Sequence, residues 1–192
     1  MVSYIVLFFS LFACAPTLQS DLDTSIVEDT EEIILGVQTS DSCGQNIGDK
    51  VCDLMLYDQH GELWRLYNLE GNVMVLDFSA MWCGPCQNAA ATVQQTQDDY
   101  ETEGFSYITV LIDDPAADIV ELDDVQSWAD THGIETAPVL QGSRDLIDYS
   151  GIEGYPIASW PTFVFIDREL NVYWGIYGFN EEYIRTQIEE ML

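Results

Sequence analysis

Hydrophobic and polar positions alternate with the period of a strand near the start of the predicted domain. Residues 51–57 alternate, residues 59–62 suit a turn, and residues 63–69 resume the alternation, which predicts a β-hairpin. Two longer apolar runs, at residues 73–78 and 105–112, contain few polar positions and are typical of strands buried on both faces. We therefore expect a buried sheet beside a hairpin.

Helical patterns follow these buried strands. Residues 85–100 lack helix breakers after the initial proline and are rich in Ala and Gln, which favours a helix. Residues 123–132 predict a second helix that ends at Gly133. Asn180 is the expected cap of a last helix, whose apolar side chains recur on one face. These side chains are Ile184, Ile188 and Leu192.

The remaining strand patterns lie between the second and last helices. Residues 137–140 predict a short strand, and residues 161–166 and 172–177 predict two strands joined by a turn at 167–171. The order is hairpin, strand, helix, strand, helix, hairpin, helix. This order favours a three-layer α/β sandwich with a central mixed sheet, flanking helices and an N-terminal hairpin extension.

Composition sets the class of protein. The chain has 192 residues, of which 47% are apolar, and this is enough for one domain with a substantial core. Thirty-four Asp and Glu face five Lys and Arg, which gives a formal charge of -29. Nucleic-acid binding needs a basic surface, so it is excluded, and so is charge-driven adhesion to anionic lipid. The acidic groups are interpreted as a solvated surface.

The N-terminal segment predicts export. Residues 4–13 are apolar but too few to span a bilayer. Leu11-Phe12-Ala13-Cys14 resembles the lipobox of bacterial lipoproteins, which implies cleavage after residue 13 and a lipid on Cys14. Two features depart from that pattern: no Lys or Arg precedes the apolar run, and Phe12 is large. A plain cleaved signal and a core-packing strand are the alternatives.

Three segments are predicted in total: a signal peptide at 1–13, an acidic tether at 14–42 and a folded domain at 43–192. Like charges extend such a tether. Its apolar patch, Ile33-Ile34-Leu35, is alternatively a first edge strand. The expected location is the bacterial periplasm or outer envelope, with a lipid anchor.

A Cys-x-x-Cys motif, Trp82-Cys83-Gly84-Pro85-Cys86, stands between the first buried strand and the first helix. A cysteine at the first turn of a helix faces unpaired N–H groups and the positive end of the helix dipole, which stabilise a thiolate. Pro85 suits an early helical position because its missing N–H costs nothing there. The two-residue spacer brings Cys86 close enough to bond the sulfur of Cys83.

This motif and a second segment resemble the thioredoxin superfamily. Residues 76–86, Leu-Asp-Phe-Ser-Ala-Met-Trp-Cys-Gly-Pro-Cys, follow the strand-to-motif pattern of that superfamily. Residues 160–167, Trp-Pro-Thr-Phe-Val-Phe-Ile-Asp, resemble its cis-proline loop. The hairpin that begins at Gly48 and the long stretch before the cis-proline are similar to the exported TlpA/ResA branch. The resemblance covers residues 43–192 and implies thiol–disulfide exchange in a thioredoxin-like fold.

The resemblance also implies catalytic roles. Cys83 would be exposed and would attack a partner disulfide as a thiolate, and the more buried Cys86 would resolve the mixed disulfide. Asp77 would accept the proton of the resolving cysteine, because burial raises the pKa of a carboxyl toward neutrality. Ala89 stands where many relatives have Glu, and Gln87 where many thioredoxins have Lys. The proton relay therefore depends on Asp77, and the thiolate on the helix terminus.

Other positions are implied to shape the substrate site. Pro161 would be cis and would present backbone to the incoming peptide. Trp82 would shield the redox pair, while Gly84 and Pro85 complete the motif. Trp160, bulky for its position before the cis-proline, would narrow the range of partners.

The other cysteines leave alternatives open. Cys43 and Cys52 are either a structural disulfide or two free thiols. They could in principle complete a zinc site with Cys83 and Cys86, but their spacing of nine does not match a zinc knuckle. Asp113-Asp114, at the end of a predicted strand, is interpreted as loop acids without a function. No metal or cofactor is expected.

The predicted function is therefore thiol–disulfide exchange on exported protein disulfides, as a reductase rather than an oxidase because Cys-Gly-Pro-Cys is the reducing type of spacer in the superfamily. The expected partners are protein thiols or disulfides and a membrane or soluble thiol electron donor. Membrane contact is expected only through the lipid anchor. A peroxiredoxin-like thiol peroxidase and a Sco-like copper-binding module are the alternatives.

Overall fold

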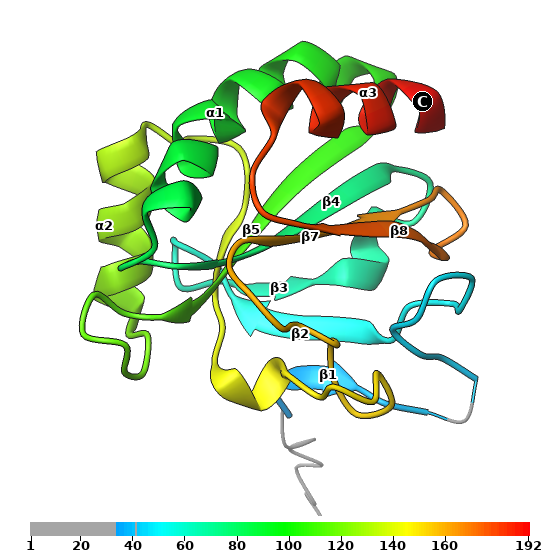
Figure 1. Cartoon of the computed structure of the whole chain (residues 1–192), viewed down its shortest axis with the longest axis horizontal. Helices are drawn as coiled ribbons and strands as arrows, with labels where there is room; N and C mark the ends of the chain where they lie inside the picture. The colour runs from blue at the N-terminus through cyan, green and yellow to red at the C-terminus, as the bar shows by residue number, and fades with distance from the viewer. Residues whose placement is uncertain (1–33, 41) are drawn as a thin grey trace, which may run out of the picture. The chain divides into compact units, whose positions relative to one another are not determined.

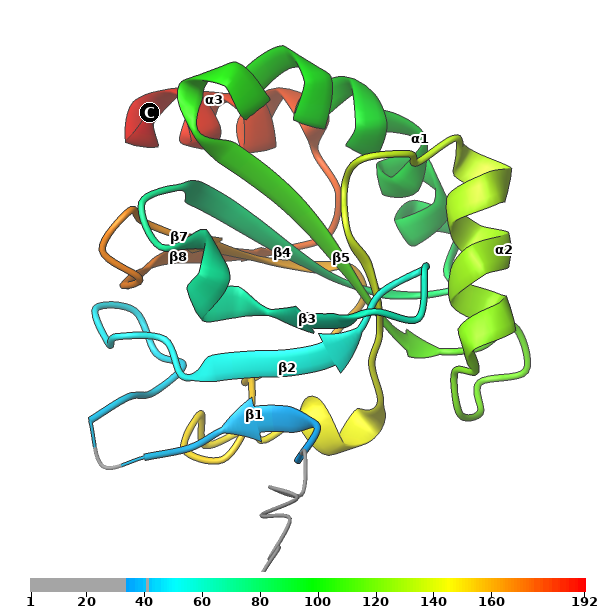
Figure 2. The ribbon, with the colours of Figure 1, turned by 180° about the vertical axis from the view of Figure 1, so that it is seen from behind.

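The computed structural model describes residues 34–40 and 42–192. The predicted signal peptide, Cys14 and most of the predicted tether lie outside these residues. The described part folds into layers: helices cover one face of a five-stranded sheet, and a small three-stranded sheet lies beneath the other face (Figures 1 and 2). The three-layer α/β architecture is confirmed, and its third layer is the N-terminal sheet.

The central sheet is mixed and has the order β6-β5-β4-β7-β8. Its two middle strands, β4 (Val73–Ala80) and β5 (Phe105–Asp113), are parallel and completely buried. β6 (Val139–Gln141) adds parallel to β5 at one edge. β7 (Thr162–Ile166) and β8 (Val172–Tyr177) add antiparallel at the other edge. The long apolar runs of the sequence thus form the centre, where both faces are covered.

Three helices complete the helical layer. α1 (Gly84–Tyr100) and α3 (Glu181–Met191) lie side by side over the sheet, and α2 (Leu122–His132) lies next to the β6 edge (Figure 1). α2 begins at a capping box between Glu121 and Asp124 and ends at Gly133, whose φ of 64° is left-handed. The helix boundaries therefore agree with the predictions to within one or two residues.

The small sheet has the order β1-β2-β3 and is antiparallel throughout. β2 (Asp53–Tyr57) and β3 (Leu63–Arg65) form the predicted hairpin. β3 is shorter than predicted because the chain turns into a 3₁₀ helix, Leu66–Leu69. The cause is the buried Asp53 carboxylate, which accepts hydrogen bonds from Arg65 Nε and, at 3.0 Å, from the Tyr67 amide. Two further 3₁₀ turns span Glu101–Glu103 and Arg144–Leu146.

One strand lies upstream of the predicted domain boundary. β1 (Gly36–Gln38) pairs with β2, although residues 36–38 fall within the segment predicted as a tether. The boundary at residue 43 is therefore too late, and the sheet begins directly after the Ile33-Ile34-Leu35 patch. The alternative of a first edge strand is placed at the Ile33-Ile34-Leu35 patch, directly before β1, because three residues carry no periodicity that would fix the bounds of a strand.

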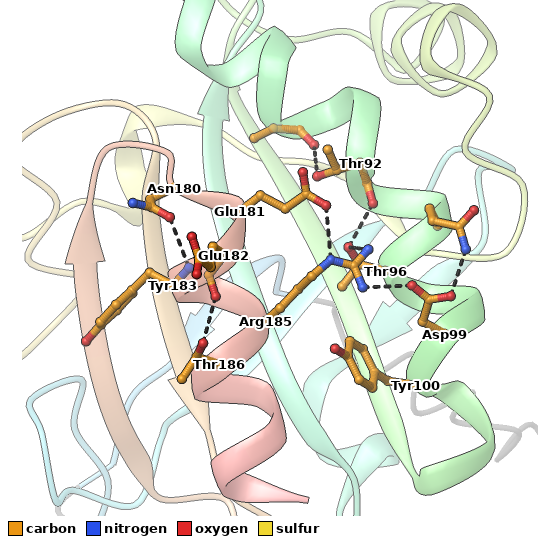
Figure 3. A network of polar contacts seen from close by, with 12 residues as sticks. Thr92, Thr96, Asp99, Tyr100, Asn180, Glu181, Glu182, Tyr183, Arg185 and Thr186 are labelled. Atoms are coloured by element: carbon orange, nitrogen blue, oxygen red, sulfur yellow. Dashed lines mark hydrogen bonds and ion pairs between the residues drawn. The ribbon is translucent and has the colours of Figure 1, made fainter.

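Arg185 holds α3 against α1 (Figure 3). Its guanidinium donates to Asp99 Oδ2 at 2.7 Å and to Thr96 Oγ1 at 3.2 Å on α1, and to Glu181 Oε1 at 3.0 Å on its own helix. The same group lies over the Tyr100 ring, 5.7 Å from its centroid. Hydrogen bonds from the side chains of Arg185 and Gln95 lower the pKa of the Asp99 carboxyl. One planar cation thus binds four partners, a geometry that an ammonium group cannot reproduce.

We predict that Arg185→Met lowers the free energy of unfolding by about 1–2 kcal/mol, because charge-assisted hydrogen bonds are lost at a partly buried site. The measurement is urea denaturation of the full chain at low and high salt. Arg185→Lys keeps the charge without the fork and should recover only part of the loss. Equal stability of wild type and the Met variant would show that the cluster does not hold α3.

Candidate functional site

Cys83 is the N-cap of α1, at the point where the chain leaves β4. Its backbone is extended, with φ of -85° and ψ of 115°, and its Sγ accepts the amide N–H of Cys86 at 3.3 Å. Gly84 and Pro85 form the first turn, so the proline takes a position that needs no N–H donor. Cys83 and Cys86 are joined as a disulfide, with their Cα atoms 5.2 Å apart.

The disulfide is covered more than expected. Cys83 is only 5% exposed, against the expectation of an exposed nucleophile, and Cys86 is fully buried. Cys83 is more exposed than Cys86, as expected, but the exposed fraction of Cys83 is small. Trp82 next to it is 47% exposed, so the indole rather than the sulfur forms the surface here.

The cis-proline segment lies at the same end of the sheet. The Trp160–Pro161 peptide is cis, and the carbonyl of Pro161 accepts the Gly178 amide at 2.8 Å. β7 begins directly after it, and Thr162 pairs with Phe78 of β4, two residues before the strand ends. The pairing of β4 with β7 therefore brings the proline loop next to the segment that carries the cysteines. Trp160 is half-buried and packs against the core on both sides of the sheet.

Asp77 is a fully buried carboxyl on β4. Side chains alternate along a strand, so Asp77 shares the helix-facing side with Val75, while Leu76 and Phe78 face the small sheet. Its Oδ1 accepts from Ser79 Oγ at 2.7 Å and its Oδ2 from Tyr107 OH at 3.2 Å. Loss of hydration raises the pKa of Asp77 to about 7, although both hydrogen bonds oppose the rise. The group can therefore take or give a proton near neutral pH.

Asp113 is a site residue that the sequence analysis misjudged. It is not a loop acid: it ends β5, is buried, and its Oδ2 accepts the indole N–H of Trp82 at 3.1 Å. Arg144 binds the same carboxylate through two bonds of 2.7 Å. These bonds, led by those from Arg144, lower the pKa of Asp113, so it stays ionised and holds Trp82 beside the disulfide. The signal in the sequence was weak, because an acid after a strand is usually solvated.

A family profile matches residues 47–174, which is more than half of the chain, and this decides its family. The chain belongs to the AhpC/TSA family. The matched segment of this AhpC/TSA chain contains the cysteine pair, Asp77, Asp113 and the cis-proline.

Curated relatives are thiol–disulfide oxidoreductases by name. The chain is similar to ResA of Halalkalibacterium halodurans, with 28% identity over 109 residues that cover 57% of this chain and 58% of that protein. It is similar to ResA of Geobacillus thermodenitrificans, with 24% identity over 146 residues that cover 76% and 78%. The first alignment spans less than two thirds of its relative. The resemblance to the ResA type is confirmed.

Solved structures confirm the thioredoxin-like fold. A protein of Chlorobium tepidum assigned as thiol:disulfide interchange protein DsbE is 27% identical, with a TM-score of 0.61, and the match covers 77% of this chain and 98% of that one. The exposed lipoprotein thioredoxin of Streptococcus pneumoniae strain TIGR4 is 26% identical, with a TM-score of 0.54, over 72% of this chain and 98% of that one.

Cys43 lies just before the segment matched by the family profile, and Cys52 lies within it. The structure joins them as a second disulfide, with Cα atoms 4.9 Å apart. It links the loop before Val51 to the start of β2. Of the two alternatives left open by the sequence, the structure has the disulfide rather than two free thiols.

Within residues 34–40 and 42–192, no group of three or more His, Cys, Asp or Glu is placed to hold a metal ion. Among the same residues, no helix combines the length and the apolar character that crossing a membrane requires.

The raised pKa of Asp77 predicts a pH-dependent stability. Its pKa is above the value of an unfolded chain, so the folded protein keeps this proton longer, and stability falls as pH rises from about 4 to about 7. Asp77→Asn removes this loss, and its stability relative to wild type should improve by up to about 4 kcal/mol over that range. Denaturant unfolding at pH 4, 6 and 8 measures it.

Asp130→Asn is the matched control, since it removes an exposed carboxylate from α2. Its difference from wild type should stay nearly constant over the same pH values. Parallel pH profiles for Asp77→Asn and wild type would contradict a raised pKa at Asp77.

Proposed function

We propose that this protein is a thiol–disulfide oxidoreductase whose redox pair is Cys83 and Cys86. The observation that carries the proposal is the placement of this disulfide at the N-terminus of α1, directly after the strand that carries the buried Asp77. The names of the ResA relatives support the same class of reaction.

The exchange proceeds in two displacements. In the reduced protein the Cys83 thiolate attacks a client disulfide, forms a mixed disulfide and releases one client thiolate. Cys86 then loses its proton and attacks the Cys83 sulfur, which releases the second client thiolate and forms the Cys83–Cys86 disulfide. Two electrons pass to the client, and a thiol donor must return them to the pair.

Local groups assist each displacement. The helix N-terminus stabilises the Cys83 thiolate, as the Cys86 amide already donates to its sulfur. Gln87 adds no charge, and its side-chain amide is bound to the Met81 carbonyl at 2.9 Å. Asp77 is the proton acceptor for Cys86, since its pKa of about 7 lets it be deprotonated near neutral pH.

The surrounding residues form the client surface. The cis Trp160–Pro161 segment contributes to this surface, although Pro161 itself is buried and its carbonyl accepts the Gly178 amide. The half-buried Trp160 limits which client segments fit. Trp82 covers the sulfur pair and is oriented by Asp113. A bound client displaces or slides past this indole to reach Cys83.

The proposal also covers the direction of electron transfer and the cellular location. The Cys-Gly-Pro-Cys spacer supports a reductase, fed by a membrane or soluble thiol donor. The N-terminal sequence supports export with Cys14 as a lipid attachment site and residues up to β1 as the tether. The name of the pneumococcal relative, an exposed lipoprotein thioredoxin, is consistent with such an anchor.

Single cysteine variants test the roles of the pair. Cys83→Ser should slow dithiothreitol-driven reduction of insulin by about a thousandfold or more, because the attacking thiolate is lost. Cys86→Ser should instead accumulate a mixed disulfide with insulin, visible on non-reducing gels. A Cys43→Ala, Cys52→Ala double variant is the control and should retain exchange.

Retained exchange in Cys83→Ser, or no trapped complex with Cys86→Ser, would contradict the assignment. If the reduced wild type consumes hydrogen peroxide faster than it reduces insulin, the protein is a peroxidase instead.

The redox potential of the pair tests direction. A reductase requires a potential below that of the glutathione pool, so we expect a value more negative than about -240 mV in dithiothreitol buffers. The double variant lacking Cys43 and Cys52 isolates the signal of the Cys83–Cys86 pair. A potential well above this value would make the protein an oxidant or isomerase.

A further inference from the structure

A cavity of about 370 Å³ lies beside the outer edge of the central sheet, and neither Cys83 nor Cys86 lines it. Its floor is formed by β7 and β8, and its walls by the loop after Cys43 and the loop before the cis-proline. The lining is mainly apolar and includes Ile47, Ile157, Val164, Trp174 and Tyr177. Its volume is at the lower end of the range of ligand pockets, which leaves room for one large side chain and part of its main chain.

One polar side chain in this cavity is unpartnered. Gln45 lines the cavity and is only 3% exposed, yet within residues 34–40 and 42–192 neither Oε1 nor Nε2 has a hydrogen-bond partner. A buried carboxamide without partners destabilises the fold. Such a group therefore indicates a guest that completes its hydrogen bonds.

Another buried glutamine in this chain shows what such a carboxamide binds. Gln59 donates from Nε2 to the Ala137 carbonyl at 3.1 Å and accepts the Val139 amide on Oε1 at 2.9 Å. These two groups belong to residues two apart, Ala137 in a bend and Val139 at the start of β6. Gln59 thus binds one donor and one acceptor of the main chain, and the Gln45 carboxamide has the same donor and acceptor.

The neighbouring strand edge is also open. The loop after Gln45 pairs with the start of β8: Gly48 N donates to the Val172 carbonyl at 2.8 Å, and Val172 N to the Asp49 carbonyl at 2.9 Å. Beyond Val172, β8 is the outermost strand of the described sheet. Large apolar side chains stand exposed around it. They are Ile47, Tyr173, Trp174 and Tyr177.

The cavity reaches the proposed exchange site at one end. Thr162 lines it and directly follows Pro161, and Tyr177 pairs with Thr162 across β7 and β8. The amide of Gly178, the residue after β8, donates to the Pro161 carbonyl at 2.8 Å. The cavity therefore adjoins the cis-proline on the small-sheet side of β7, while Cys83 and Cys86 pack on the helix side, so a client reaches both around the end of the sheet.

We propose that this cavity binds an apolar side chain of an extended client polypeptide, while Gln45 pairs with the main-chain amides of that segment. The identity of the guest as a client rests on the proposed function. An apolar lining and a chain of charge -29 disfavour an anionic guest. The exchange site thereby gains a second contact that selects clients by an apolar residue near their cysteine.

Binding is tested with N-acetyl-leucine N-methylamide as the probe and the full, ¹⁵N-labelled chain. The side-chain NH₂ signals of Gln45 should shift on titration, together with the indole signal of Trp174. The corresponding methyl ester lacks one amide N–H and should bind about five- to tenfold more weakly. No shift at Gln45 up to the solubility limit of the amide would overturn the proposal.

Two variants separate guest binding from a structural role. Gln45→Leu should raise the thermal midpoint of unfolding, because it removes an unpartnered amide, and should weaken the probe about tenfold. Gln126→Leu, on the exposed side of α2, is the control for the substitution itself. It should change neither the thermal midpoint nor the affinity for the probe. A lower thermal midpoint in Gln45→Leu would show that the carboxamide is already hydrogen-bonded, for example to water, and would overturn the proposal.

A variant that fills the cavity tests whether the cavity contributes to the exchange reaction with peptide clients. Gly175 lines the floor, and a Cβ added there would meet only the Phe163 carbonyl, at 3.5 Å, which is an ordinary contact, so the main chain accepts Gly175→Val. The ratio of the exchange rate with a Leu-containing disulfide peptide to that with glutathione disulfide should fall about tenfold. An unchanged ratio overturns the inference alone, whereas absence of exchange with both substrates in wild type overturns the proposed function.

Discussion

Complete burial of β4 is the constraint on which the rest of the structure depends. The strand is paired on both edges, by β5 and β7, and covered on both faces, by helices and by the small sheet. A carboxyl placed on such a strand loses its hydration, so the position of Asp77 alone explains its raised pKa. The chain can leave the strand only at its end, where it turns into α1 and sets Cys83 at the helix start.

The fold was largely predictable because its main elements carry long patterns. The runs that became β4, β5 and β7 are mostly apolar over five or more residues, and the helices show clear caps, as at Asn180 and Gly133. The Cys-Gly-Pro-Cys motif and the Trp-Pro segment could also be recognised, because each is defined by a few consecutive residues. That the two segments lie close together follows from the order of the strands and not from any signal in either segment.

The features that escaped the sequence analysis depend on partners far along the chain. β1 has three residues, and only its pairing with β2 makes it a strand. Asp113 reads as a solvated acid until Arg144 and Trp82 are seen to bind it, at sequence separations of 31 residues. Gln45 is an ordinary polar loop residue by sequence, and only its burial beside β8 identifies it as a candidate binding residue.

All five basic side chains of this acidic chain are engaged within the protein. Arg65, Arg144 and Arg185 bind carboxylates, Lys50 lies over the Tyr67 ring, and Arg168 donates to backbone carbonyls that include Gly71 and Leu192. No side-chain cation is left over to offset the remaining acids, so dissolved cations must do so. At 0.1 M salt, exposed charges more than about 10 Å apart are largely screened from one another, and at 1 M salt this distance falls to about 3 Å. The surrounding electrolyte is thus in effect a component of this protein's surface.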